Sequence, residues 1–411
     1  MQNGGSTPGD VWYRLSPIRF IVLAILALGV VILISCAAGI SSHQSAAGYA
    51  QYQDAPVKLP VSAIFGSNRR LWRVVSTDDH VYVDYSTDYG KSFSPPVAVN
   101  EERIPIRSRS EYRSQIVVDK TGRIYVAYPA YGQQPWTTYL SVSEDNGRHF
   151  SIPEPLSDQA GVANSFEATL AIDGQDCLHA FWHDERESAS EETGNAIYFS
   201  VRDSTGRLLE SNRNLAQGVC SCCRLALDFD SDGQPVLLYR NIYPGNIRDH
   251  ELAKADAAGG WAKSRVSEDE WRIQACPTDG PALAIGTDGR YHIAWFTQGS
   301  VRQGLFYANS SDRGQHFSKP MPIGSNQDQL PGHPAVISLG SRVILTWSEF
   351  DGISTRIMIL QSHDRGNRWS QARSVAESTS ESDYPFLLSD GQGIFLSWNS
   401  QIEGYRLIPI E

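Results

Sequence analysis

Short segments of the form S-x-D-x-G-x-x-aromatic recur along the chain, and their spacing constrains the fold more than any other feature. Four copies are intact, STDYGKSF, SEDNGRHF, SSDRGQHF and SHDRGNRW, and two are degenerate, RDSTGRLL and ADAAGGWA. The steps between successive aspartates are 57, 58, 53, 56 and 52 residues, for the series Asp88, Asp145, Asp203, Asp256, Asp312 and Asp364. So regular a period indicates a fold built from at least six copies of one unit.

Each repeat also carries the pattern of four short strands. Two apolar runs separated by a Gly/Asp turn come first, as in QIVVDKTGRIYVAY and ALAIGTDGRYHIAW. A run such as AIYFSV precedes the motif, and a short one such as FSIPEP follows it. Runs rich in Val, Ile and aromatic residues between turn residues predict strands. Four antiparallel strands in roughly 50 residues are typical of one β-propeller blade.

We therefore predict an all-β chain that folds as a β-propeller of seven four-stranded blades. The blades are expected to start near residues 60, 112, 165, 220, 278, 331 and 383. The last run has three strands and no motif, so we expect Ala55–Leu59 to supply its outer strand, because a propeller closes by joining its two chain ends. Six blades are the alternative if the run VSAIFGSN is not a strand.

The N-terminal segment has a different composition from the repeats. Arg14 and Arg19 precede FIVLAILALGVVILIS, a run of 16 uncharged residues that ends at Cys36. Such a run is shorter than the ~20 apolar residues of a spanning helix, and with its positive flank it predicts a secretory signal. We assign 1–36 to a signal peptide or, alternatively, an uncleaved signal anchor, 37–54 to a polar linker and 55–411 to the propeller. Both alternatives predict a membrane-anchored propeller outside the cytoplasm.

The charge balance argues against some partners. The chain has 35 basic and 46 acidic residues, a net charge of -11, and no basic run. Nucleic acid and anionic membrane surfaces are therefore not expected partners. We predict no cofactor, and we expect a glycan or another small acidic ligand, with a protein partner as a further alternative.

The cysteines gather around two stretches, VCSCCR and QACPTDGP. An oxidising compartment permits disulfides, and both stretches precede inner strands of neighbouring blades. We predict one or two disulfides there. The alternative is a thiolate metal site for copper(I) or zinc, although the C-x2-C spacings typical of zinc are absent. The cysteines of these stretches are Cys220, Cys222, Cys223 and Cys276, and Cys177 lies apart from them.

The recurring segments resemble the Asp box of bacterial sialidases and of many other secreted propellers. This resemblance covers nearly the whole chain from Pro60, and it implies a propeller in which the box is a structural clasp at the rim: its Gly has positive φ, its Ser and Asp bond local backbone groups, and its aromatic residue packs between blades. The tetrapeptide Leu33–Cys36 resembles the lipobox of bacterial lipoproteins, which implies a lipidated Cys36 in the periplasm or at the cell surface. C-x-C-C, the I-R-D loop and C-P-x-x-G-P together look like a subgroup of sialidase-like lipoproteins.

The same resemblance implies where the chemistry lies. Sialidases grip the substrate carboxylate with three arginines on the axial face, and they use a Tyr paired with a Glu as nucleophile and an Asp as acid/base catalyst. Arg113 in YRSQIVV occupies the slot of the first arginine, although Ser-Gln replaces the Ile-Pro of the family motif. The catalytic candidates are Tyr384 as nucleophile, Glu167 near it and Asp184 as acid/base. The substrate-binding candidates are Arg113, Arg224, Arg240, Arg248, Asp249, Asp279 and His333.

Two functions stay open at this point. The first is an extracytoplasmic sialidase-like propeller that binds the terminal acidic sugars of glycans and, as an exo-sialidase, hydrolyses them. The second is a non-catalytic, lipid-anchored propeller that binds a protein, a glycan or a metal through its axial face and cysteines. Cysteines that converge at the pocket floor would favour the second, because a catalytic sialidase needs no thiol there.

Overall fold

A computed structural model describes residues 57–131, 135–187, 193–256, 258–275, 277–324 and 329–411. The chain divides into two compact units, Met1–Gln51 and Tyr52–Glu411, and every described residue belongs to the second. The predicted signal segment with Cys36, the linker to Asp54, and Cys276 lie outside the described residues. In the described ranges, no helix has the length and apolar character needed to cross a membrane.

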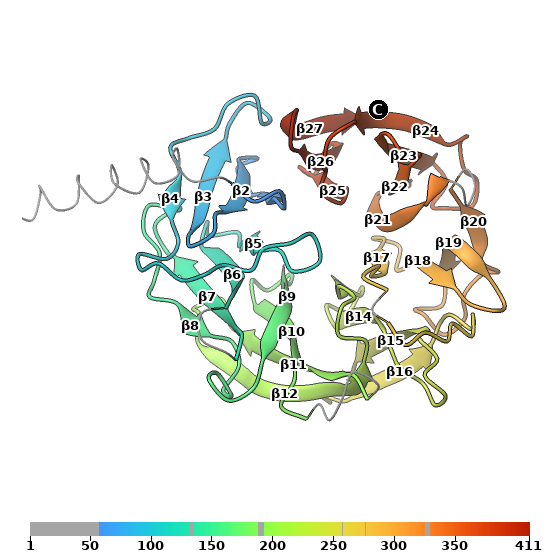
Figure 1. Cartoon of the computed structure of the whole chain (residues 1–411), viewed down its shortest axis with the longest axis horizontal. Coiled ribbons are helices and arrows are strands. Elements are labelled where there is room, and N and C mark those ends of the chain that lie inside the picture. Colours follow the sequence, from blue (N-terminus) through green and yellow to red (C-terminus); the bar gives the residue numbers. More distant parts are fainter. Residues whose placement is uncertain (1–56, 132–134, 188–192, 257, 276, 325–328) are drawn as a thin grey trace, which may run out of the picture. The chain divides into compact units, whose positions relative to one another are not determined.

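The described residues form seven antiparallel sheets that follow one another around a ring, which confirms the predicted all-β propeller (Figure 1). Blade 1 contains β1 (Ser62–Phe65), β2 (Leu71–Ser76), β3 (Val81–Ser86) and β4 (Val97–Ala98). Blade 2 contains β5 (Gln115–Val118), β6 (Ile124–Ala130), β7 (Thr137–Ser143) and β8 (Glu154–Pro155). Blade 3 contains β9 (Ser165–Ile172), β10 (Leu178–Asp184), β11 (Asn195–Arg202) and β12 (Leu208–Val219).

The remaining blades repeat the same order. Blade 4 contains β13 (Ala226–Phe229), β14 (Pro235–Arg240), β15 (His250–Ala255) and β16 (Trp261–Arg265). Blade 5 contains β17 (Ala282–Ile285), β18 (Tyr291–Gln298), β19 (Gln303–Ser310) and β20 (Met321–Ile323). Blade 6 contains β21 (Gly332–Leu339), β22 (Arg342–Phe350), β23 (Thr355–Ser362) and β24 (Arg373–Ser378). Blade 7 contains β25 (Phe386–Ser389), β26 (Ile394–Ser400) and β27 (Gly404–Ile410).

The run VSAIFGSN does form a strand, β1, so the count is seven blades and the six-blade alternative is wrong. Blade 7 has three strands among the described residues. Its expected fourth strand, Ala55–Leu59, lies partly outside them, and Val57–Leu59 is not in a strand. Instead, the carbonyl oxygen of Leu59 accepts a hydrogen bond from the Asn399 side chain on β26 at 2.7 Å.

Polar contacts help to close the ring, and among the described residues no strand of the N-terminal segment joins the sheet of blade 7. Arg113 donates to both carboxylate oxygens of Asp383, at 2.9 and 2.5 Å, and both side chains are buried. Asp383 also accepts a hydrogen bond from the backbone N–H of Val61 at 3.1 Å. Arg69, in the turn between β1 and β2, pairs at 2.7 Å with Asp390, in the turn between β25 and β26. Blades 1, 2 and 7 are thereby joined by charged groups at the point where the two ends of the propeller meet.

The hydrophobic core lies between blades rather than within them. One cluster joins Trp72 and Val83 of blade 1 to Ile124 and Tyr128 of blade 2, and each later pair of neighbours shares a cluster of the same kind. Large aromatic residues fill these interfaces from the second strands, among them Trp182, Trp295, Trp347 and Trp398. Since each face of a blade is covered only by its neighbour, the blades depend on the closed ring for stability.

The S-x-D-x-G-x-x-aromatic segments have the clasp role expected of them, as the copy between β7 and β8 illustrates. The Ser143 hydroxyl accepts the backbone N–H of Gly147 at 2.8 Å, and Asp145 accepts two backbone N–H groups at 3.0 Å. Gly147 has a φ of +77°, and a Cβ there would lie 2.8 Å from the Trp72 ring of blade 1. Only glycine combines this backbone with so close a neighbour.

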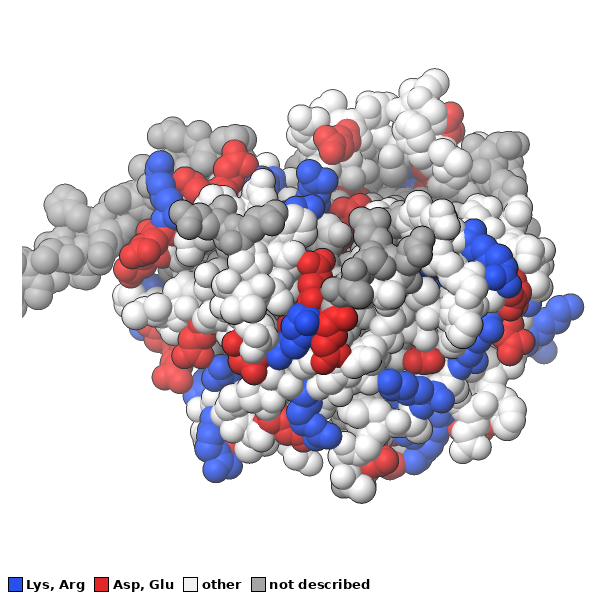
Figure 2. All heavy atoms as spheres, turned by 60° about the horizontal axis from the view of Figure 1, so that its bottom comes forward, with Lys and Arg blue, Asp and Glu red and all other residues white. Residues whose placement is uncertain are grey.

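The surface carries both charges. Figure 2 shows Lys and Arg interspersed with Asp and Glu over the face that is turned forward. Many of these groups pair with each other, as Arg313 does with Asp232 and Arg202 with Glu154 at 3.0 Å.

Candidate functional site: the axial pocket

A pocket of about 230 Å³ lies where the inner strands meet. Six of the seven first strands contribute to its wall, β5, β9, β13, β17, β21 and β25. Apolar residues such as Leu283 and Phe386 form much of the lining. The charged and polar groups that reach it are Ser110, Glu111, Arg113, Gln115, Glu167, Thr169 and Arg224. A small volume with a few convergent polar groups is typical of a ligand site for one small molecule.

A tyrosine and a glutamate are paired beside this pocket. The Tyr384 hydroxyl donates to Glu111 Oε1 at 2.5 Å, and the Tyr384 ring stacks on His333 with 3.4 Å between ring centroids. Burial raises the pKa of Tyr384, and the hydrogen bond to Glu111 raises it further. Tyr384 thus has the glutamate partner predicted for it, but the partner is Glu111 rather than Glu167.

Sequence reasoning missed Glu111 as a functional residue. It lies in the loop before β5, two positions ahead of Arg113, and 273 residues separate it from Tyr384. Its position in the segment EYR, directly before the first strand of a blade, was a signal that could have drawn attention to it.

Arg224 brings a positive charge to the pocket wall. Its side chain is half-buried, its Nη2 donates to the carbonyl oxygen of Pro334, and its buried Nη1 has no hydrogen-bond partner among the described residues. Burial lowers the pKa of Arg224, and the charges of Asp279, Tyr384 and Glu167 oppose that effect. A buried guanidinium nitrogen without a partner is costly, so this nitrogen is available to bind an anion.

Arg113 also lines the pocket, but its charge is already compensated. Its guanidinium forms the bidentate pair with Asp383 and donates to the carbonyl oxygen of Val61 at 3.1 Å. The residue predicted to grip a substrate carboxylate therefore holds a carboxylate of the protein itself. Its contribution in this structure is to close the ring.

Glu167 is a strained, buried carboxyl group in the pocket wall. It has a φ of +51°, and neither of its carboxylate oxygens has a hydrogen-bond partner in the described part of the chain. Burial, with the nearby charge of Cys220, raises its pKa well above the usual range. His183 Nε2 is 3.8 Å from Oε2, beyond hydrogen-bond distance. Burial therefore favours the protonated form of Glu167, in a backbone conformation that costs free energy and is often found at functional sites.

Asp184 lies outside the axial pocket, and its carboxylate is engaged elsewhere. It accepts hydrogen bonds from Arg186 at 2.8 Å, from Ser157 at 2.9 Å and from the Trp182 indole at 3.0 Å. Glu349 accepts the indole N–H of Trp347 at 2.7 Å in the equivalent place of blade 6. This recurrence indicates a structural contact, so the structure does not bring Asp184 to Tyr384 as its acid/base partner.

Three more of the predicted binding residues form a separate buried network on blade 4. Arg240 donates to the carbonyl oxygens of Arg248, Asp279 and Phe296, all at 2.9 Å. Asp249 pairs with Arg265 and accepts the backbone N–H of Asp269 at 3.0 Å. These contacts hold Arg240 and Asp249 to other parts of the protein, although Arg240 Nε and Asp249 Oδ1 have no hydrogen-bond partner among the described residues.

Asp279 and His333 lie near the Tyr384 end of the site. The Asp279 carboxylate accepts the backbone N–H of His333 at 3.0 Å and interacts with the charge of Arg224. Burial lowers the pKa of His333, against the opposing effect of Asp279. A neutral imidazole therefore stacks on Tyr384, and the two residues support the site's geometry.

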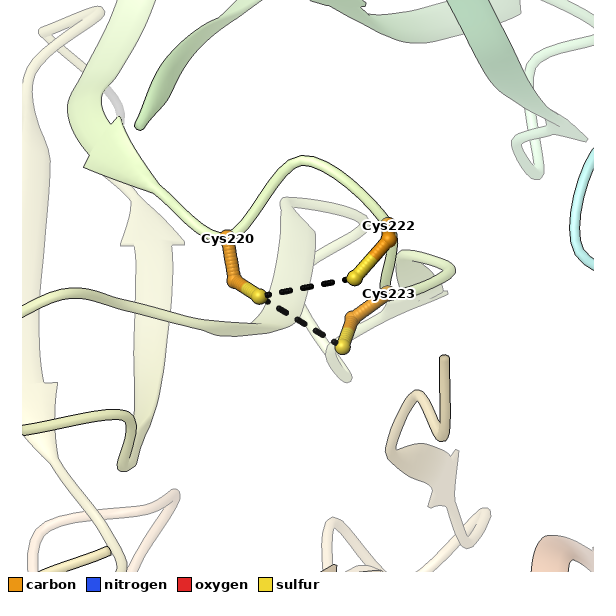
Figure 3. Close-up of side chains that lie close together, drawn as sticks. All are labelled: Cys220, Cys222 and Cys223. Atoms are coloured by element: carbon orange, nitrogen blue, oxygen red, sulfur yellow. Dashed lines mark hydrogen bonds between the residues drawn. The ribbon is translucent and has the colours of Figure 1, made fainter. Parts of the chain in front are cut away.

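The cysteines between β12 and β13 converge in space (Figure 3). Cys220 Sγ is 3.8 Å from the sulfur of Cys222 and 3.8 Å from that of Cys223. The hydrogen bond from Cys223 lowers the pKa of Cys220 to about 6 against burial, with help from Arg240 and Arg248. Burial raises the pKa of Cys223 well above the usual range. Cys222 is disulfide-bonded, and its partner lies outside the described residues.

Comparison with known proteins gives matches among solved structures only. No family model matches the chain, and no curated protein does. The Hadza microbial sialidase Hz136 is 12% identical, with 83% of this chain and 76% of that one covered and a TM-score of 0.50. An ulvan lyase of polysaccharide lyase family PL25 is 10% identical (86% and 94% covered, TM-score 0.51), and polysaccharide lyase Uly1 is 9% identical (83% and 86%, 0.52).

This chain shares the propeller fold of these proteins. At 9 to 12% identity the likeness concerns the fold alone, and it carries over no residue of their sites. The residues described above must therefore support the functional assignment.

Proposed function

We propose that the axial pocket binds the acidic terminal sugar of a glycan and hydrolyses its glycosidic bond in the manner of an exo-sialidase. The observation that carries this proposal is the 2.5 Å hydrogen bond from Tyr384 to Glu111 beside a pocket with a buried arginine. A tyrosine nucleophile suits a sugar that bears a carboxylate, because a carboxylate nucleophile would be repelled. The names of the similar structures, a sialidase and two polysaccharide lyases, support a carbohydrate ligand.

Arg224, Glu111 and Glu167 of the pocket each have a part in this reaction, whereas Arg113 stays paired with Asp383. Arg224 binds the substrate carboxylate through its unpartnered Nη1. Glu111 takes the proton of Tyr384 as the phenolic oxygen attacks the anomeric carbon. Glu167 in its protonated form donates its proton to the departing glycosidic oxygen. Water then cleaves the tyrosyl–sugar bond, the ionised Glu167 accepts its proton, and Tyr384 regains its own from Glu111.

A second candidate function is binding without hydrolysis. The observation that favours it is the Arg113–Asp383 ion pair, because Arg113 is then not available to a ligand. Of the pocket's arginines Arg224 remains, whereas sialidases grip their substrate with three. Both candidates use the same pocket and the same arginine, so they differ only in turnover.

Binding of free sialic acid to Arg224→Met tests the part that both candidates share. A charged hydrogen bond contributes about 1.5–3 kcal/mol, so calorimetry should show an affinity at least about tenfold weaker than that of the wild type. Arg313→Met is the matched control, because Arg313 is an exposed arginine that pairs with Asp232 at the rim. Unchanged affinity in a folded Arg224→Met protein would exclude Arg224 as the anion site.

We further propose that the propeller is anchored outside the cytoplasm through a lipid on Cys36. The basis is the LISC tetrapeptide after the apolar run. Incorporation of labelled palmitate into the wild type but not into Cys36→Ser is the expected result, and equal labelling of both would contradict it.

A further inference from the structure

Three buried sulfur atoms meet where the chain passes from β12 to β13. Cys220, Cys222 and Cys223 have exposures of 0 to 2%, and their sulfur atoms all lie within 4.8 Å of one another. Two metal–sulfur bonds of about 2.3 Å at trigonal or tetrahedral angles separate their sulfurs by roughly 3.8–4.0 Å. The 3.8 Å distance between the sulfur atoms of Cys220 and Cys223 matches that separation (Figure 3).

Two arginines lie close enough to the sulfurs to offset the negative charge of metal-bound thiolates. Arg248 Nη1 donates to Cys220 Sγ at 3.2 Å, and the positive charge of Arg240 acts on both Cys220 and Cys223. Two buried thiolates with one monovalent cation carry a net charge of -1, and these guanidinium groups offset it. Without these guanidinium groups, a buried charged site would cost a large desolvation free energy.

We propose that Cys220 and Cys223 bind one copper(I) ion, with the Cys222 sulfur at the edge of the site. Cys220 and Cys223 are free thiols, whereas Cys222 is disulfide-bonded and is not required as a thiolate ligand. Thiolate sulfur is a soft donor that selects copper(I). Structural zinc takes four ligands, but the described residues offer a cluster of only three candidate donors, all of them sulfur.

This site borders the proposed glycan site, since the charge of Cys220 acts on Glu167 in the pocket wall, but the two sites use different residues. Among the described residues that line the axial pocket there is no cysteine, and Arg248 does not line it either. The copper proposal therefore does not rest on the proposed function, and failure of one leaves the other standing.

Anaerobic competition with a chromophoric copper(I) chelator tests the site in the full chain. The wild type should retain one copper(I) per chain, and Cys220→Ser and Cys223→Ser should each bind it at least tenfold more weakly. Cys177→Ser is the matched control, because Cys177 is the remaining free thiol among the described cysteines and lies on blade 3, before β10. Retention by both serine variants at the wild-type level, or no retention by the wild type, would overturn the proposal.

Two measurements on the unmodified chain test the site even if the serine variants fail to fold. Copper(I) should raise the thermal unfolding midpoint, because a ligand that binds only the folded state stabilises it, and zinc at the same concentration should raise it less. X-ray absorption of the copper-loaded chain should show sulfur neighbours. Nitrogen and oxygen neighbours alone, or an equal shift with zinc, would overturn the proposal.

Discussion

Glu167 shows at the level of one residue how burial can prepare a group for chemistry. Its carboxyl group lies in the pocket wall at a strained φ of +51°, with both oxygens unpaired among the described residues. A carboxyl group placed only for stability would be expected to find hydrogen-bond donors, as Asp184 does. The contrast between these two acids is the reason that the proposed proton donor is Glu167.

Glu167→Gln should therefore lower kcat for a sialoside by about 10²–10⁴-fold and leave KM nearly unchanged, because the loss of a general acid affects the transition state. Burial raises the pKa of Glu167, and only its protonated form can act as the acid, so kcat should fall as the pH rises through that pKa. The alkaline limb of the pH–rate profile should be absent from the variant. A variant that keeps this limb would assign the proton to another group.

At the level of the single element, the motif hairpins are the units that the sequence determines most fully. Ser86 accepts the backbone N–H of Gly90, and Asp88 accepts the backbone N–H of Ser92, at 2.8 and 2.9 Å. The Phe93 ring then packs edge-on against Tyr405 of blade 7, with 5.9 Å between ring centroids. The donors and acceptors of these two hydrogen bonds lie within eight consecutive residues, whereas Phe93 and Tyr89 make distant contacts, Tyr89 through a hydrogen bond to Asp390 at 3.1 Å.

Acid should weaken these clasps within a defined pH range. Hydrogen bonds, first from the Ser92 side chain and then from its backbone, lower the pKa of Asp88 from 3.8 to about 2. A carboxylate with a lowered folded-state pKa contributes stability above pH 3.8, and that contribution is lost as the pH falls toward 2. The denaturant midpoint of the wild type should fall more steeply over this range than that of Asp88→Ala. Parallel curves would show that the Asp88 clasp does not stabilise the fold.

The strands and their order were predictable because period-two runs and tight turns are local features. β1, β9 and β21 begin within about two residues of the predicted blade starts at 60, 165 and 331. The Tyr384–Glu111 pair was not predictable, because 273 residues separate its members and the loop before β5 has no periodic pattern to fix its geometry. For the same reason the motif suggested that the Arg113 guanidinium was free to bind a substrate. In the structure it is paired with Asp383, which lies 270 residues away in the sequence.

At the scale of the whole molecule, stability depends on closure of the ring. Hydrophobic clusters join each blade to the next, including blade 7 to blade 1 through Tyr405 and Tyr82. The buried Arg113–Asp383 pair lies at the same seam and joins blade 7 to blade 2. The seam where the two ends of the propeller meet is therefore the place where a single substitution should destabilise the whole propeller.

Asp383→Ala should lower the free energy of unfolding by about 3–5 kcal/mol, because removal of one partner leaves the Arg113 charge buried and uncompensated. Asp78→Ala is the control, since Asp78 is 80% exposed in its pair with Lys58 and such surface pairs contribute at most about 1 kcal/mol. Chemical denaturation of both variants measures the difference. Equal small losses would mean that closure does not depend on the buried pair.

The central claim is that the motif repeats build the ring and that the Tyr384–Glu111 pair at its axis does the chemistry. The most direct test is turnover of a fluorogenic sialoside by the full chain, by Tyr384→Phe, and by Tyr131→Phe as a control at an exposed tyrosine. We predict turnover by the wild type and the control, and a loss of at least about 10³-fold in kcat for Tyr384→Phe, because phenylalanine has no nucleophilic oxygen. Wild-type turnover by Tyr384→Phe, or no turnover by any of the three proteins, would contradict the account.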